Sequence, residues 1–124
     1  MRYYRSNHHV ERKPDGTFVT TADIEIEESL QQMIHRRDPE HVIFSEETNN
    51  QPDRISPGNK NSWIIDPIDG TKSFVQGVPL YGVLIAREGP AGVDIGCVYM
   101  PALDEMVWAA RGEGCWWNGR RAAV

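Results

Sequence analysis

WIIDPIDGT, residues 63–71, joins an apolar run to a cluster of acids and hydroxyls. Its apolar residues 63–65 have the composition of a strand that is covered on both faces. Pro67 has no N–H for a sheet ladder, so we expect the strand to end at this residue. The sequence therefore predicts that Asp66 and Asp69 lie at the exit of a buried strand.

These two acids suit a hard cation. Asp66 and Asp69 are close enough in the chain for their carboxylates to converge on one ion if the segment turns. The carbonyl of Ile68, turned outward between them, can supply a third oxygen. Such an oxygen-only ligand set is typical of magnesium sites.

Gly70 and Thr71 extend the motif toward an anion site. Gly70 permits a close backbone approach, and Thr71 can cap a short helix over residues 71–77. The first N–H groups of that helix would face an anion such as phosphate. An Asp-Gly pair after a strand is most often only a turn, so the motif by itself leaves a purely structural role open.

Length and composition indicate one globular domain. The chain has 124 residues, of which 40% are hydrophobic and 25% charged, and a net charge of -5 argues against a nucleic-acid partner. No apolar run is long enough to span a membrane, and residues 1–5 lack the apolar core of a signal peptide, so we expect a cytoplasmic protein without a membrane partner. Cys97 and Cys115 are expected to be packed, reduced thiols.

The periodicity of the chain favours an α+β fold. Apolar residues recur at helical spacing over 22–37, and Asp38-Pro39 is expected to end this helix. Strand-like runs follow, with tight turns between the later ones, at residues 41–44, 63–65, 81–87, 93–100 and 105–111. Short consecutive strands of this kind predict an antiparallel sheet, here backed by one main helix.

Turns and aromatic residues complete this picture. Residues 49–61 are polar and contain Pro and Gly, which predicts a surface loop. Asn118-Gly119 favours a type I′ turn. Trp116 and Trp117 are expected to be core residues rather than a binding patch.

Two further positions carry acids that could join the cation site. Glu46 and Glu47 follow the predicted strand 41–44, and since adjacent side chains of a strand point to opposite faces, only one of them can readily reach the cation. Asp23 lies in the first turn of the predicted helix 22–37. A negative charge is favourable there without any ligand, so its role is open on this ground alone.

The motif at residues 66–71, with Phe74 just after it, resembles the signature of the inositol monophosphatase family. Further blocks occur in family order at residues 15–23, 44–48 and 112–119. The run 73–86 is similar to the histidinol-phosphatase-like branch. Because family members are longer, we expect residues 1–124 to form an N-terminal metal-binding domain of the sugar-phosphatase type, without the family's first helix and C-terminal α/β domain.

The resemblance implies a metal-dependent reaction, the hydrolysis of a phosphate monoester by water, with Mg²⁺ or Mn²⁺ as cofactor and sensitivity to lithium. It implies a first metal held by three groups, the Glu47 and Asp66 carboxylates and the Ile68 carbonyl, and a second held by Asp66 and Asp69. It also implies that two groups act in catalysis by activating the water, namely Glu47 and Thr71 paired with Asp23. The N–H groups of Gly70 and Thr71 would bind the phosphate.

Three interpretations compete at this point. The favoured one is a phosphatase acting on a small phosphorylated metabolite, such as an inositol phosphate or histidinol phosphate. A truncated domain that binds metal or phosphate without turnover is the alternative. A haloacid-dehalogenase-type phosphatase is disfavoured, because its two acids have one residue between them, whereas Asp66 and Asp69 have two. An exposed sheet face, expected where a second domain would pack, favours association, and we expect a homodimer.

Overall fold

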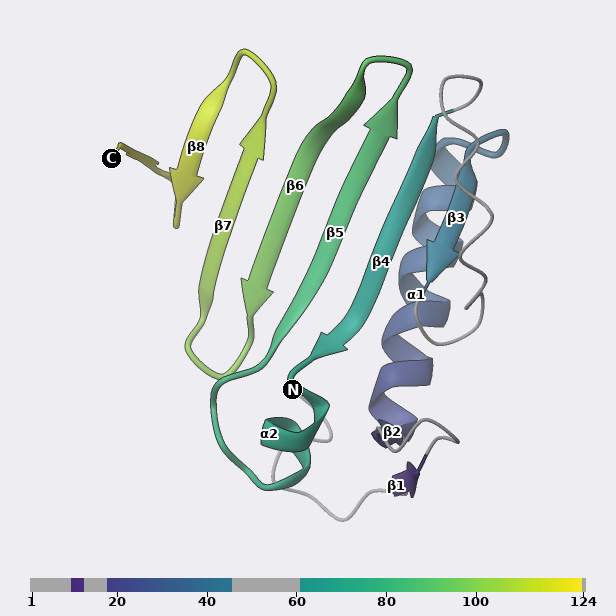
Figure 1. Ribbon diagram of the computed structural model, residues 1–124, viewed down its shortest axis with the longest axis vertical. Coiled ribbons are helices and arrows are strands. Elements are labelled where there is room, and N and C mark those ends of the chain that lie inside the picture. The colour runs from purple at the N-terminus through teal and green to yellow at the C-terminus, as the bar shows by residue number, and fades with distance from the viewer. Residues whose placement is uncertain (1–9, 13–17, 46–60, 124) are drawn as a thin grey trace.

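The computed structural model describes residues 10–12, 18–45 and 61–123, which are dominated by one long sheet (Figure 1). Seven strands are hydrogen-bonded side by side in sequence order. They are β3 (Val42–Ser45), β4 (Ser62–Asp69), β5 (Gly82–Gly89), β6 (Gly92–Met100), β7 (Glu105–Ala110), β8 (Gly114–Trp117) and β9 (Arg120–Ala122). A separate antiparallel pair is formed by β1 (Val10–Arg12) and β2 (Phe18–Thr20).

The long sheet is mixed rather than purely antiparallel. From β4 to β9 each strand pairs antiparallel with the next. Short turns join the strands from β5 to β9, whereas residues 70–81, which contain a short helix, join β4 to β5. The exception is the edge strand β3, which runs parallel to β4 with Ile43 opposite Trp63. The α+β fold with one main helix is confirmed, and the parallel edge strand is a detail that the sequence did not indicate.

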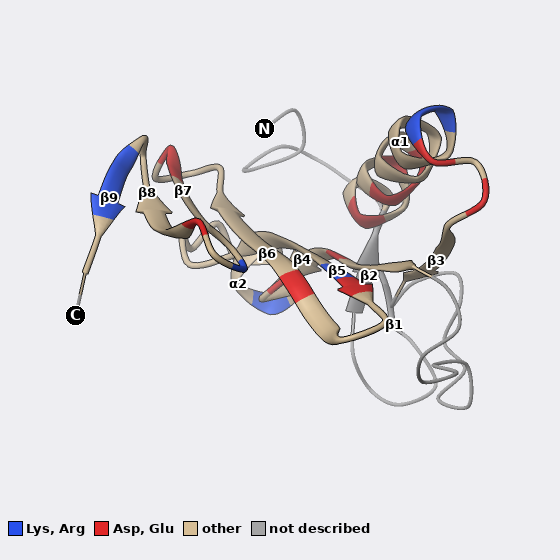
Figure 2. Ribbon diagram, turned by 90° about the horizontal axis from the view of Figure 1, so that it is seen from above, with Lys and Arg blue, Asp and Glu red and all other residues tan. Residues whose placement is uncertain are grey.

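The main helix, α1 (Thr21–Arg37), covers one face of the sheet at its β3–β4 end (Figure 2). Its charges follow the helix dipole, with Asp23 in the first turn and basic residues in the last turn at His35, Arg36 and Arg37. Ala22 and Ile34 are buried on the side that faces the sheet. No helix within the described ranges is both long and apolar enough to cross a membrane.

A small apolar core lies where the start of α1 meets the end of β4. It contains Ala22, Ile68, Phe74 and Tyr81, each at most 2% exposed. Phe74 belongs to the short helix α2 (Thr71–Val75), and its ring meets that of Tyr81 edge-on with centroids 5.1 Å apart. Edge-on aromatic pairs add to the stability gained by burial. The core therefore fixes β4, α1 and α2 to one another.

Three local predictions need correction. Strand β4 does not end at Pro67 but continues to Asp69. The short helix covers 71–75 instead of 71–77, and its N-cap is Gly70, with no side-chain capping bond from Thr71. Trp117 is 51% exposed, so it is not a core residue.

Other local predictions are confirmed or lie outside the described residues. Asn118 and Gly119 have φ angles of 46° and 76°, as a type I′ turn requires. Cys97 and Cys115 are free thiols, each half-buried. The block at 15–17 and most of the proposed loop, 49–60, fall outside the described ranges.

Candidate active site

The end of β4 carries a bulge between the two acids of the motif. Asp66 pairs with Leu84 and Asp69 with Gly82, so β4 advances by three residues while β5 advances by two. Pro67 lies within this segment, where a missing N–H costs no regular ladder bond.

This bulge decides where the two carboxylates can point. Side chains alternate along a regular strand, so residues three apart would face opposite sides of the sheet. One extra residue on β4 cancels this difference and allows Asp66 and Asp69 to share a face. Asp66 is half-buried and Asp69 is exposed, so the pair lies at the boundary between the core and solvent.

Gly70 makes the turn from β4 into α2. Its φ angle is 84°, a left-handed conformation that side chains with a Cβ rarely adopt. A Cβ on this residue would also stand 2.9 Å from the carbonyl oxygen of Leu80. The Gly70 carbonyl accepts a hydrogen bond from the Phe74 N–H at 3.0 Å. Both the conformation and the close packing therefore require glycine.

The hydroxyl of Thr71 links three elements of the fold. It lies 3.0 Å from the Ile68 carbonyl oxygen at the end of β4 and 3.4 Å from Oδ1 of Asp23 in α1. A hydroxyl has one proton to donate and two lone pairs with which to accept. A Thr71 hydroxyl that donates to either oxygen can therefore still accept a hydrogen bond from a third group.

Asp23 is a fully buried acid beside the apolar core. Its side chain is 0% exposed, and its neighbour Ala22 is a member of the core cluster. A second acid of the same helix, Glu27, is also fully buried and accepts a hydrogen bond from Nε2 of Gln31 at 2.9 Å. Buried carboxylates are costly unless they have polar partners or a cation, so their burial favours a specific role.

The described residues supply part of the metal-ligand set that the sequence predicts. Asp66, Ile68 and Asp69 follow one another on β4. The Ile68 carbonyl has a second lone pair for a cation even while it accepts from Thr71. These oxygens fit a hard cation such as Mg²⁺. Within the described ranges, no group of three or more His, Cys, Asp or Glu side chains forms a metal cluster, and Glu47 lies outside those ranges.

The structure also shows features of the site that sequence reasoning missed. The bulge and the contact of Gly70 with Leu80 both depend on the partner strand β5 and the segment leading into it. The Pro inside a strand-like run was the available signal for the bulge, since Pro within a sheet is confined to edges, strand starts and bulges.

The clearest electrostatic effect lies at the other end of β5. Arg87 donates two hydrogen bonds to Asp94 on β6, at 2.9 and 2.8 Å. These bonds, and the positive charge that makes them, hold the pKa of the Asp94 carboxyl below its ordinary value. The pair lies in a different part of the sheet from Thr71 and Asp23, and it does not act on the candidate site directly.

The chain is similar to known proteins over most or all of its length. The family model described as "Inositol monophosphatase family" matches residues 1–124. A histidinol-phosphatase from Chlorobaculum parvum is 46% identical over 112 residues, an alignment that covers 90% of this chain. The chain spans 42% of the length of that relative.

Solved structures show the same arrangement of elements. An IMPase from Thermotoga maritima superposes with a TM-score of 0.86 at 33% identity, over 99% of this chain and 46% of its own. An IMPase/NADP phosphatase solved in complex with Mg²⁺ and phosphate has a TM-score of 0.82 at 29% identity, over 93% of this chain and 43% of its own. Because the family model covers the whole chain and the fold agrees, the chain belongs to the inositol monophosphatase family.

Proposed function

We propose that this chain provides the metal-binding part of a Mg²⁺-dependent phosphatase that hydrolyses a small phosphate monoester. The observation that carries the proposal is the Thr71 hydroxyl, which lies within hydrogen-bond distance of the buried Asp23 carboxylate and of the Ile68 carbonyl. Thr71 thus contacts the backbone of Ile68, which lies between the two acids in the chain. Membership of a phosphatase family supports the reaction class.

The proposed roles follow from the chemistry of each group. Glu47, Asp66, Asp69 and the Ile68 carbonyl would hold Mg²⁺, with Mn²⁺ as a second suitable ion. The bound ion would supply charge neutralisation at the phosphoryl oxygens and a more acidic water. The backbone N–H groups of Gly70 and Thr71 would contact the phosphate.

The chain's own residues would then position and deprotonate the attacking water. With its proton donated to Asp23, the Thr71 oxygen can accept a hydrogen bond from that water and orient it. Glu47 would take the water's other proton as it attacks phosphorus. The leaving alkoxide acquires a proton from solvent, so the products are an alcohol and inorganic phosphate.

Two substrate classes suit the proposal. The 46% identity to a histidinol-phosphatase favours histidinol phosphate as the first substrate to test, and an inositol phosphate is the second. The competing function is metal or phosphate binding without turnover. The coverage of that relative, 42% of its length, favours this second function for the 124 residues on their own.

The deciding experiment uses a protein of the relatives' full length that contains this chain. We expect it to release phosphate from one of these substrates with Mg²⁺ and to lose that activity when the metal is chelated. Glu47→Gln should lower kcat far more than KM, because the lost group acts in the transition state. Hydrolysis that survives complete chelation would refute the mechanism.

A binding measurement tests the metal site that both functions require. Asp66→Asn in the 124-residue chain should nearly abolish Mg²⁺ binding in calorimetry. Asp104→Asn makes the same chemical change on the turn between β6 and β7 and should leave binding unchanged. Metal binding that depends on Asp66, together with no turnover at full length, would favour the binding function over the phosphatase.

A further inference from the structure

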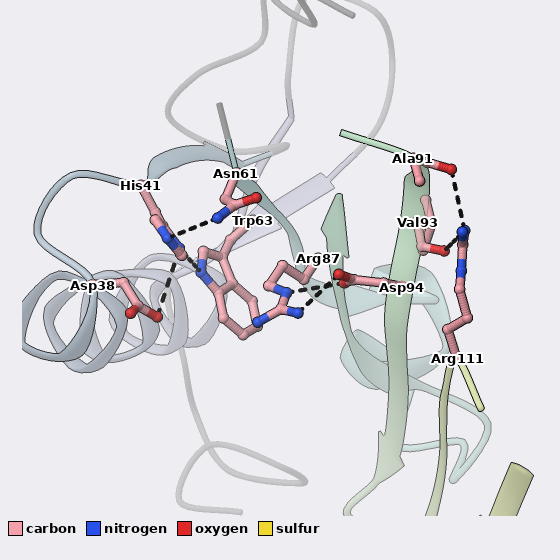
Figure 3. Close-up of polar contacts among 9 residues, drawn as sticks. All are labelled: Asp38, His41, Asn61, Trp63, Arg87, Ala91, Val93, Asp94 and Arg111. Atoms are coloured by element: carbon pink, nitrogen blue, oxygen red, sulfur yellow. Dashed lines mark hydrogen bonds and ion pairs between the residues drawn. The ribbon is translucent and has the colours of Figure 1, made fainter. Parts of the chain in front are cut away.

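Two side chains lie next to the same ring nitrogen of His41, one a hydrogen-bond donor and the other an acceptor. The indole N–H of Trp63 donates to Nδ1 of His41 at 3.1 Å. Oδ2 of Asp38 lies 3.6 Å from the same nitrogen (Figure 3). Asp38 follows the last turn of α1, and Trp63 lies on β4, so the imidazole lies between the helix end and the sheet.

The other ring nitrogen of His41, Nε2, lies next to the side chain of Asn61. Nε2 of His41 lies 3.3 Å from Nδ2 of the Asn61 side chain (Figure 3). An imidazole that accepts at Nδ1 carries its proton on Nε2, so the Asn61 amide has to turn by 180°, which places its oxygen next to that N–H. With the amide turned in this way, the Nε2 side is satisfied whether the ring is neutral or charged, and only Nδ1 changes its role on protonation.

Protonation makes the two contacts at Nδ1 mutually exclusive. An indole N–H can only donate and a carboxylate can only accept, so neutral Nδ1 serves Trp63 and protonated Nδ1 serves Asp38. We propose that His41 is a proton-operated switch, which binds Trp63 of β4 when neutral and releases it for Asp38 when charged. The ordinary charge change of an imidazole lies between pH 5 and 8, and this is the range over which the proposal is tested.

The charged groups around the switch leave this exchange intact. The charged groups with contacts to the His41–Trp63 pair in Figure 3 are Asp38 after α1 and Arg87 on β5, and Asp94 on β6 is bound to Arg87. The Arg87 guanidinium lies over the Trp63 ring, 6.0 Å from its centroid, and Asp94 neutralises it. Trp63 thus keeps its ring packing when its N–H loses the acceptor.

The switch would act on the strand that carries the candidate site. Trp63 and Asp66 belong to the same strand, β4, and Trp63 pairs with Ile43 of the parallel edge strand. Loss of the His41 bond removes a side-chain tie between the start of β3 and β4. Acidification should therefore loosen β4 at the end opposite its bulge, without direct titration of Asp66 or Asp69.

The test is an NMR titration of the 124-residue chain labelled with ¹⁵N. The four tryptophans give four indole N–H signals, and Trp63→Phe identifies the one that belongs to Trp63. From pH 8 to pH 5 we expect the Trp63 indole proton to move upfield along a one-proton curve, as it loses a strong acceptor. A Trp63 signal that stays constant over this range in the unmodified chain would overturn the proposal.

Two variants test the partners. His41→Asn places a permanently neutral amide near the Nδ1 position and should make the Trp63 signal independent of pH. Asp38→Asn removes the carboxylate that a protonated Nδ1 would bind, so the Trp63 signal should change less between pH 8 and pH 5. An unchanged titration curve in His41→Asn, or an undiminished change of the Trp63 signal in Asp38→Asn, would refute the exchange of partners.

Discussion

Gly70→Ala should be the most informative small substitution in the chain. Gly70 has a φ angle of 84°, and an added Cβ would stand 2.9 Å from the Leu80 carbonyl oxygen and 3.4 Å from the Cα of Tyr81. Both contacts are with backbone, which cannot rotate away as a side chain can. The substitution therefore combines a conformational cost with a steric one at the junction of β4 and α2.

The size of each cost can be separated with a matched control. Gly112 has nearly the same φ angle, 80°, but an added Cβ there meets nothing within 4 Å. Gly112→Ala should cost only the left-handed conformation, about 1 to 2 kcal/mol. Gly70→Ala adds overpacking of about 1 to 3 kcal/mol, for a total loss of roughly 2 to 5 kcal/mol in the free energy of unfolding.

Urea unfolding measures this difference directly. With an m-value of about 2 kcal/mol/M, a loss of about 3 kcal/mol lowers the unfolding midpoint by roughly 1.5 M. The midpoint of Gly112→Ala should fall by about a third to two thirds of that amount. If the two variants are equally destabilised, the backbone at Leu80 yields to the new Cβ and the close packing behind Gly70 is not a constraint.

Two further predictions concern side-chain contacts. Thr71→Val removes the hydroxyl that lies near Ile68 and Asp23, so the free energy of unfolding should fall by about 1 to 3 kcal/mol. Thr71→Ser keeps the hydroxyl and should retain most of this stability, and equal losses in both variants would show that the methyl group matters and the hydroxyl does not. The pKa of the Asp94 carboxyl is lowered by the hydrogen bonds from Arg87, so this stabilisation is present above the ordinary Asp range near pH 4 and is lost as the pH falls through the lowered value. In Arg87→Met, NMR titration should find the Asp94 midpoint at higher pH, and an unmoved midpoint would contradict the assigned cause.

The helix and the hairpin turns could be predicted because local sequence determines them. Helical spacing over 22–37 and the Asp38-Pro39 stop gave bounds that agree with α1 to within one residue at its start. The Asn118-Gly119 turn needs two positive φ angles, which these residue types favour. In both cases the relevant interactions lie within a few residues of one another.

The features that were missed depend on segments distant in sequence. Pro67 ends a ladder locally, but opposite β5 it occupies a bulge, and the strand continues. Trp116 and Trp117 point to opposite faces of β8, so one of them stacks on Trp108, with centroids 5.9 Å apart, while the other is exposed. The parallel pairing of β3 with β4 joins segments on either side of residues 46–60, and no local pattern specifies it.

The strand order of the sheet also divides its folding into an early and a late part. From β5 to β9 every pairing joins neighbours in the chain through a short turn, so most of the sheet can form hairpin by hairpin with small loop-closure entropy. Strand β4 reaches β5 across residues 70–81, which contain α2. The β3–β4 pair has to close the longer connection over residues 46–61 before its contacts contribute. Substitutions at the β5–β6 contacts, such as Ile85→Val, should therefore mainly slow folding, whereas Ile43→Val on β3 should mainly accelerate unfolding. Both β3 and β4 then join hairpins that are already formed, so the candidate site at the end of β4 is completed late in folding.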